Sequence, residues 1–238
     1  MKINKNEYFK LYDKYEKPAS TLFHKYVSKK LARVFTYYFL KFNFTPNMMS
    51  FFTFVLSVMA VSFLLYFPNY EGILLFLILL QFSYVLDCSD GVVARITKTS
   101  SKFGAYFDIT LDRLNIMVIL TGVGIYHFMN NDFKLNELYI YLISSIFYIN
   151  YQILSTIRPY YFPELNGYMK KKQKSLIQQI IKLIYEFIDT GIFYFILSVS
   201  LFFNIEIYTM LYYGIISLLL SVGNYIVLYN RTDLKKNG

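Results

Sequence analysis

Six apolar stretches alternate with short polar connections along the chain. They cover residues 48–67, 72–96, 103–129, 137–157, 187–203 and 207–229. Several of them approach or exceed the roughly 18 apolar residues that are typical of a membrane-spanning helix. We therefore predict six transmembrane helices and assign the fold class as all-α integral membrane protein. The apolar residues then lie in a helical bundle within lipid rather than in the core of a soluble protein.

The residues before the first apolar stretch are basic and semi-polar. Between Pro18 and Phe44, apolar side chains recur among lysines and arginines, which predicts an amphipathic helix lying in the membrane interface. This helix either covers a site at the cytoplasmic face or simply anchors the chain. We divide the chain into a cytoplasmic N-terminal segment that contains this helix (residues 1–45), a six-helix transmembrane domain (46–230) and a cytoplasmic tail (231–238).

The distribution of charge predicts the orientation. Of the 238 residues, 56% are hydrophobic, which excludes a disordered chain. When the spans alternate, every one of the 24 Lys and Arg residues except Arg113 and Lys134 falls on the side of the amino terminus. This is the positive-inside pattern, so we place both termini in the cytoplasm of a multi-pass cell-membrane protein. The net charge of +9 then faces anionic membrane lipids, and no nucleic-acid partner is needed.

Four aspartates lie in the second and third predicted spans, where acidic side chains are costly. They are Asp87, Asp90, Asp108 and Asp112. An Asp at the centre of a span costs roughly 2.5 to 3.5 kcal/mol, so four facing lipid would cost on the order of 10 kcal/mol. Ionisable side chains within spans therefore face the bundle interior or a wet cavity, and they mark a functional site.

Helical spacing places the two aspartates of each span on one face, together with small residues. These faces hold Asp87, Asp90, Gly91 and Ala94 on one span and Gly104, Asp108 and Asp112 on the other. Because the polar connection at residues 97–102 is short, the two spans are predicted to be antiparallel neighbours. The four carboxylates then converge in the cytoplasmic half of the membrane.

Converging carboxylates repel one another unless a cation neutralises them. Oxygen ligands without His or Cys favour a hard ion, Mg²⁺ first, with Mn²⁺ or Ca²⁺ behind it. Four acids suit two ions, and a pair of ions binds phosphoryl oxygens on both the attacking and the leaving side. The small residues Gly91 and Ala94 either leave room for a bulky ligand or serve helix packing. Arg95 either binds a phosphate or extends to the interface.

The same residues form a pattern that resembles the signature of the CDP-alcohol phosphotransferases, also called CDP-alcohol phosphatidyltransferases. It reads Asp87-x2-Asp90-Gly91-x2-Ala94-Arg95-x8-Gly104-x3-Asp108-x3-Asp112, with eight fixed positions over 26 residues. The sequence Thr45-Pro46-Asn47, the amphipathic helix before it and the six spans are also similar, so the resemblance covers most of the chain.

This resemblance implies a metal-dependent transferase of phospholipid synthesis. Such an enzyme cleaves the pyrophosphate of a CDP-linked substrate, transfers the phosphoalcohol to a second alcohol and releases CMP. Carried over residue by residue, Asp87, Asp90 and Asp108 would bind Mg²⁺ or Mn²⁺. Asp112 would contribute to a second ion and act as the general base on the attacking hydroxyl. A base must lie within hydrogen-bond reach of that hydroxyl, and Asp112 follows Asp108 by one helical turn.

The resemblance also implies a nucleotide site and a homodimer. Gly91 and Ala94 would border the cytidine with Asp90 close by, and Arg95 would lie near the nucleotide phosphates. The second alcohol is not encoded in the signature. Arg158, at the cytoplasmic end of the fourth span, either binds the phosphate of a phosphorylated acceptor or is a positive-inside anchor.

Three functional hypotheses stay open. The first is a transferase that uses CDP-diacylglycerol as donor and a small alcohol or phosphorylated alcohol as acceptor. The second uses the same chemistry with a CDP-linked polar alcohol as donor and a lipid or polyol as acceptor. The third, from another class, is a cation channel or transporter. An ion path needs polar groups across the whole membrane, whereas these acids cluster in one leaflet, which favours the transferase.

Overall fold

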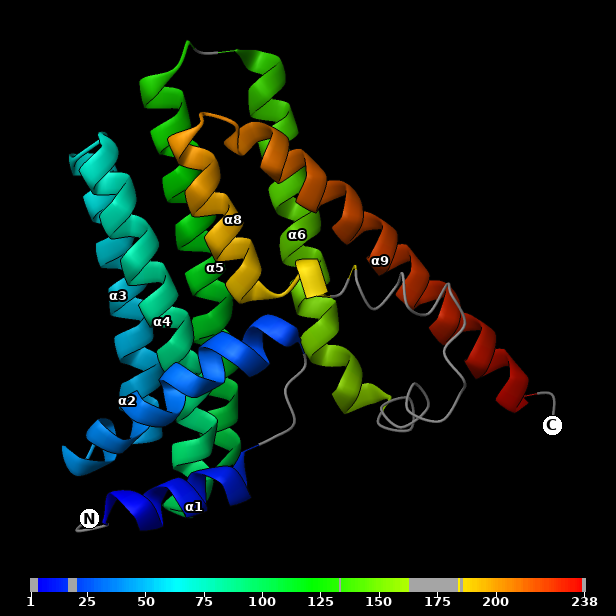
Figure 1. Cartoon of the computed structure of the whole chain (residues 1–238). Coiled ribbons are helices and arrows are strands. Elements are labelled where there is room, and N and C mark those ends of the chain that lie inside the picture. The colour runs from blue at the N-terminus through cyan, green and yellow to red at the C-terminus, as the bar shows by residue number, and fades with distance from the viewer. Residues whose placement is uncertain (1–3, 17–20, 133, 163–183, 185, 237–238) are drawn as a thin grey trace.

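A computed structural model of the protein describes residues 4–16, 21–132, 134–162, 184 and 186–236. The elements in this part of the chain are all helical, which confirms the predicted all-α class. They are α1 (Lys5–Tyr15), η1 (His24–Ser28), α2 (Lys29–Lys41), α3 (Pro46–Tyr66), α4 (Tyr70–Ile96), α5 (Lys102–Asn130), α6 (Leu135–Tyr161), α8 (Thr190–Phe202) and α9 (Glu206–Lys236). Figure 1 shows the long helices as a bundle, with α1 and α2 lying across one end.

Five of the described helices are long and apolar enough to cross a membrane. The qualifying stretches are α3, α4, α5, Leu135–Pro159 of α6 and Glu206–Ile226 of α9. They match five of the six predicted spans. The remaining prediction, residues 187–203, corresponds to α8, which has only 13 residues. A helix of that length is about 20 Å long, shorter than a hydrocarbon core of about 30 Å, so it does not reach the length expected of a span.

Side-chain caps and left-handed residues set where the helices begin and end. Thr45 caps α3 by accepting a hydrogen bond from Met48 N at 3.3 Å, and Ser101 caps α5 by accepting one from Gly104 N at 2.9 Å. Lys98, which follows the end of α4, has a positive φ of 57°. This sharp turn keeps the connection short, so α4 and α5 run antiparallel with their aspartates at the same end.

Helix α3 packs against both α4 and α5, while α6 packs chiefly against α9 (Figure 1). A continuous cluster of buried apolar side chains joins these groups through α8, with Phe193 at its centre fully buried. Close approach of α3 and α5 requires a glycine, because a Cβ on Gly122 would lie 2.3 Å from Val61 Cγ1. The core therefore fills the bundle on the side of the aspartates that lies away from α1 and α2.

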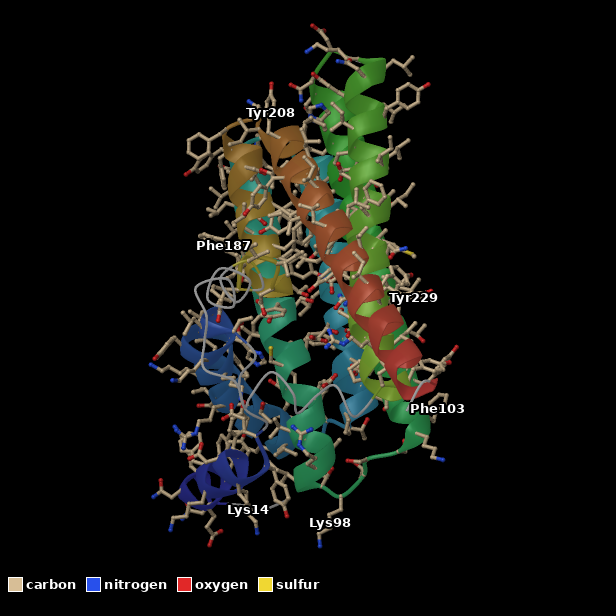
Figure 2. The ribbon with its side chains drawn as sticks, turned by 90° about the vertical axis from the view of Figure 1, so that its right-hand side faces the viewer. Lys14, Lys98, Phe103, Phe187, Tyr208 and Tyr229 are labelled. Atoms are coloured by element: carbon tan, nitrogen blue, oxygen red, sulfur yellow. The ribbon has the colours of Figure 1, made fainter. Side chains whose placement is uncertain are left out.

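The N-terminal region has more helix than predicted. Elements η1 and α2 lie within the predicted amphipathic stretch, and α2 packs against α4 through Ala32, Thr36 and Leu40, which share one buried face. Helix α1 was not predicted. Figure 2 shows Lys14 of α1 and Lys98 at one end of the bundle and Tyr208 of α9 at the other. At the other terminus α9 continues to Lys236, so residues 231–236 of the predicted tail prolong the last helix.

Candidate active site

The aspartates of α4 and α5 converge as predicted. One carboxylate oxygen from each of Asp87, Asp90 and Asp108 lies within 4.8 Å of the other two. Asp112, one turn further along α5, lines a small cavity together with Asp87. Asp90 is buried and the other three are partly buried. The short turn between the helices and the 3.6-residue period produce this arrangement, which we call the acidic cluster (Asp87, Asp90, Asp108 and Asp112).

A serine that sequence reasoning missed lies between two of these carboxylates. Ser50 Oγ of α3 is 2.7 Å from Asp90 Oδ2 and 3.1 Å from Asp108 Oδ1. Its hydroxyl carries one proton, so it donates to one carboxylate at a time. A signal was present in the sequence, because Ser50, Thr53 and Ser57 form a polar stripe at helical spacing within an apolar run. The stripe faces α4, where Ser57 Oγ lies 3.1 Å from Ser83 Oγ.

The donor set of the acidic cluster fits a hard divalent cation. All of its ligand atoms are carboxylate oxygens, the type that Mg²⁺ and Mn²⁺ prefer. Within the described residues, no Lys or Arg forms an ion pair with any of the four aspartates. The two nearby arginines are engaged elsewhere, since Arg95 donates to Tyr15 O and Arg113 to Thr156 and Gln152. The negative charge is therefore left for a cation to neutralise.

A cavity of about 270 Å³ opens beside the acidic cluster, between α3, α4, α5 and the α4–α5 connection. Its walls include every residue of the predicted nucleotide site and further positions of the motif: Asp90, Gly91, Ala94, Arg95, Gly104 and Asp108. The glycines keep it open, because a Cβ on Gly104 would lie 3.2 Å from Asn47 Oδ1, and one on Gly91 would lie 3.2 Å from Arg95 Nη1. The cavity is near the lower end of the size range of small-molecule sites.

A second cavity, of about 50 Å³, is lined by the other two aspartates. Asp87 and Asp112 share it with Arg113 and with Tyr194 of α8. The start of α8 is fixed there by Asp189, which accepts hydrogen bonds from Gly191 N at 3.0 Å and from a tyrosine hydroxyl of α4. The acidic cluster thus borders two cavities, with Asp90 and Asp108 on the larger and Asp87 and Asp112 on the smaller.

Arg158, the predicted acceptor-binding residue, is not brought to the acidic cluster. Its Nη1 donates to Asn224 Oδ1 of α9 at 2.9 Å, and it lines neither cavity. Arg113 does line the smaller cavity. It was noted in the sequence only as a basic residue inside a span, and its position beside Asp112 is the signal that could have singled it out.

Comparisons with known proteins point to the same chemistry. The model of a family described as CDP-alcohol phosphatidyltransferase matches residues 43–228. The chain is 34% identical over 84 residues to the bifunctional IPC transferase and DIPP synthase of Aquifex aeolicus, which is 35% of this chain and 18% of that protein. It is 37% identical over 81 residues to the archaetidylinositol phosphate synthase of Pyrococcus horikoshii, which is 34% of this chain and 41% of that protein. Each match thus covers less than half of the relative's own length.

Proposed function

Because the chain belongs to the CDP-alcohol phosphatidyltransferase family, we propose that it transfers a phosphoalcohol from a CDP-linked donor to the hydroxyl of a second alcohol and releases CMP. One observation carries this proposal. Three carboxylates with oxygens within 4.8 Å of one another lie at the edge of a cavity of about 270 Å³. The walls of that cavity hold the small residues and the arginine expected around a nucleotide.

In this proposal Asp87, Asp90 and Asp108 hold Mg²⁺ or Mn²⁺, and Asp112 contributes to a second ion. When bound, such ions neutralise the phosphoryl oxygens on the attacking and leaving sides. The hydroxyl of Ser50 orients the carboxylates of Asp90 and Asp108. The cytidine lies against Gly91 and Ala94, with Asp90 close by, and Arg95 lies near the phosphates of the nucleotide.

Asp112 acts as the general base. Its carboxylate accepts the proton of the acceptor hydroxyl while that oxygen forms a bond to the phosphorus that carries the donor's alcohol. The bond from this phosphorus to the oxygen of CMP breaks, and CMP leaves with that oxygen. Attack in line with the leaving group requires the acceptor and CMP on opposite sides of the phosphorus. The two cavities bordered by the acidic cluster support this geometry, because Asp112 lines the one that Asp90 does not.

For the substrates, we propose a CDP-linked lipid such as CDP-diacylglycerol as donor and a phosphorylated polyol as acceptor. The name of the relative from Pyrococcus horikoshii, an archaetidylinositol phosphate synthase, supports a phosphorylated inositol-type acceptor or product. A CDP-linked polar alcohol as donor is the alternative. Arg113 is better placed than Arg158 to meet an acceptor phosphate, since only Arg113 lines a cavity beside Asp112.

We further propose six membrane crossings, with both termini and the acidic cluster on the cytoplasmic side and η1 and α2 in the membrane interface. The α3–α4, α5–α6 and α8–α9 connections lie at one end of the bundle, and the α4–α5 connection lies at the other with α1 and α2 (Figure 1). This alternation supports α8 as the short helical part of a crossing. The resemblance to the family supports a homodimer.

The experiment that tests the function measures release of CMP by the purified full chain. Labelled CDP-diacylglycerol is offered with glycerol phosphate, inositol phosphate, inositol or serine, with and without Mg²⁺ or Mn²⁺. We expect metal-dependent CMP release with one of the phosphorylated acceptors, and CMP-dependent release of labelled lipid in the reverse direction. Turnover only with a CDP-linked polar alcohol would replace the proposed donor. Ion flux without CMP release would favour the channel hypothesis.

A further inference from the structure

Helix α1 lies outside residues 43–228, the part of the chain that the family model matches. It is nevertheless firmly packed. Tyr8 and Tyr12, one helical turn apart, are each 1% exposed. Their rings join a cluster of buried side chains from the following helices: Leu40, Met49, Val92, Val93 and Ile96. Burial of two aromatic rings holds α1 against the end of α4 that carries the nucleotide cavity.

Two ion pairs join the C-terminal part of α1 and the residue that follows it to α2. Asp13 Oδ2 lies 2.6 Å from Arg33 Nη2, and Glu16 Oε1 lies 3.2 Å from Lys29 Nζ. The guanidinium of Arg33 also lies 4.4 Å from the ring centroid of Phe9. These contacts are partly exposed, so each contributes little alone. Together with the buried tyrosines they fix the position of the last turn of α1.

That last turn contacts the candidate active site. Arg95 Nε donates a hydrogen bond of 2.8 Å to the backbone carbonyl of Tyr15. The carbonyls at a helix C-terminus lack partners within the helix and carry partial negative charge, which favours a cation there. The other end of the same guanidinium lies over Gly91, where a Cβ would be 3.2 Å from Nη1. Arg95 therefore reaches from α1 into the cavity that it lines.

We propose that α1 is a positioning element for nucleotide binding: the carbonyl of Tyr15 holds Nε of Arg95, so that the terminal nitrogens face a phosphate of the CDP-linked substrate. This inference rests on the proposed function. An arginine side chain that is free in solution loses rotamer freedom when it binds a ligand. Because α1 has already fixed the guanidinium, its planar pair of donors meets the phosphate without that loss.

The test undocks α1 in the full chain with Tyr12→Asp. A carboxylate is costly to bury at this position, which the ring of Tyr12 fills, so the helix leaves its site. Binding of CDP to the purified protein in Mg²⁺ is measured by titration calorimetry, and KM and kcat are measured with CDP-diacylglycerol. We expect Kd and KM to rise about tenfold, equivalent to about 1.4 kcal/mol, with kcat changed less than about twofold. A purely structural defect would instead lower the active fraction and leave Kd unchanged.

A double-mutant cycle tests whether α1 affects CDP binding through Arg95. Arg95→Gln removes the charge and is expected to raise Kd for CDP by at least as much as Tyr12→Asp. If α1 acts through Arg95, adding Tyr12→Asp to Arg95→Gln produces no further increase. Effects that multiply would show that α1 acts independently of Arg95 and would overturn the inference.

The matched control is Tyr12→Phe, because the buried hydroxyl of Tyr12 has no hydrogen-bond partner. We expect Tyr12→Phe to bind CDP as the wild type does. If Tyr12→Asp does not fold, Tyr12→Ala replaces it in the same cycle. Weakened CDP binding in Arg95→Gln with normal binding in an undocked Tyr12 variant would overturn the role of α1 and leave the proposed function intact. A wild-type protein that neither binds CDP nor releases CMP would overturn both.

Discussion

The two ends of α5 each carry a group of ionisable side chains, and the groups differ in how their charge is balanced. At one end is the acidic cluster. At the other, His127 Nδ1 lies 2.6 Å from Glu206 Oε1 of α9, and Nε2 lies 3.3 Å from Glu137 Oε2 of α6. Lys134 Nζ lies 3.0 Å from Glu137 Oε1. We call this second group the histidine–glutamate cluster (His127, Lys134, Glu137 and Glu206).

The comparison teaches that burial of ionisable groups does not by itself mark a functional site. In the histidine–glutamate cluster each acid has a basic neighbour, and the contacts fasten α5, α6 and α9 together. In the acidic cluster no described basic side chain forms an ion pair with the aspartates, and two cavities adjoin them. The paired charges of the histidine–glutamate cluster join helices, whereas the unpaired carboxylates beside the cavities offer the oxygen ligands that a divalent cation needs.

The largest expected effect is on turnover, from Asp112→Asn. An amide of the same shape cannot accept the proton of the attacking hydroxyl, so we expect kcat to fall by about 10² to 10⁴. The Kd for the CDP-linked donor should stay within a few-fold, because Asp112 does not line the larger cavity. Steady-state kinetics and CDP titration of the same preparation measure both. Equal losses of binding and turnover would contradict the role of Asp112 as base.

The next largest effect is on stability, from His127→Leu at the other end of α5. His127 is 5% exposed and Glu206 is fully buried. The substitution leaves the Glu206 carboxylate buried without its basic neighbour, which costs about 3 to 5 kcal/mol in unfolding free energy. Thermal unfolding in detergent, with or without Mg²⁺, should show the loss. The kcat of the remaining folded protein should match the wild type, and a reduced kcat would show that this cluster also serves catalysis.

In contrast to His127→Leu, Asp90→Asn should stabilise the protein in the absence of metal. Removing one of several clustered negative charges relieves repulsion, so the variant should unfold at a higher temperature than the wild type in a chelator. Added Mg²⁺ should stabilise the wild type by about 2.7 kcal/mol at one hundred times its Kd, and the variant by less. The chelator should also abolish turnover of the wild type. A variant that is less stable than the wild type in the chelator would show that the acids do not repel one another.

The sequence was sufficient to predict the acidic cluster because its signal is local. Aspartates at i and i+3 or i+4 share one face of each helix, and the short turn between the helices brings both pairs to the same end of the bundle. The all-α class follows from the length of the apolar runs. Helical spacing placed Gly91 and Ala94 beside the aspartates, whereas the nucleotide site with Arg95 was predicted from the family resemblance; all three residues line the larger cavity.

The remaining features depend on packing between distant segments. His127 and Glu206 are 79 positions apart, so their pairing is set by how α6 packs against both α5 and α9. The partners of Arg158 and Arg95 likewise come from α9 and α1. Ser50 carries no charge, and only its helical spacing with Thr53 distinguishes it from other serines in apolar runs. Within the predicted span at residues 187–203, the structure has the shorter helix α8, which begins at Thr190 and ends at Phe202.

The smallest expected effect comes from Lys134→Ala, at the exposed edge of the histidine–glutamate cluster. The hydrogen bond with Glu137 raises the pKa of Lys134, so the folded protein holds this proton more tightly than the unfolded chain. The resulting stabilisation is present below the ordinary lysine range and is lost as pH rises through the raised pKa, above about 10.5. The side chain is 60% exposed, and solvent screens such a pair. We therefore expect no resolvable change in unfolding temperature at pH 7, measured beside His127→Leu. If Lys134→Ala destabilised the protein as much as His127→Leu, the balance of charge at this end of α5 would depend on the lysine rather than on the buried imidazole.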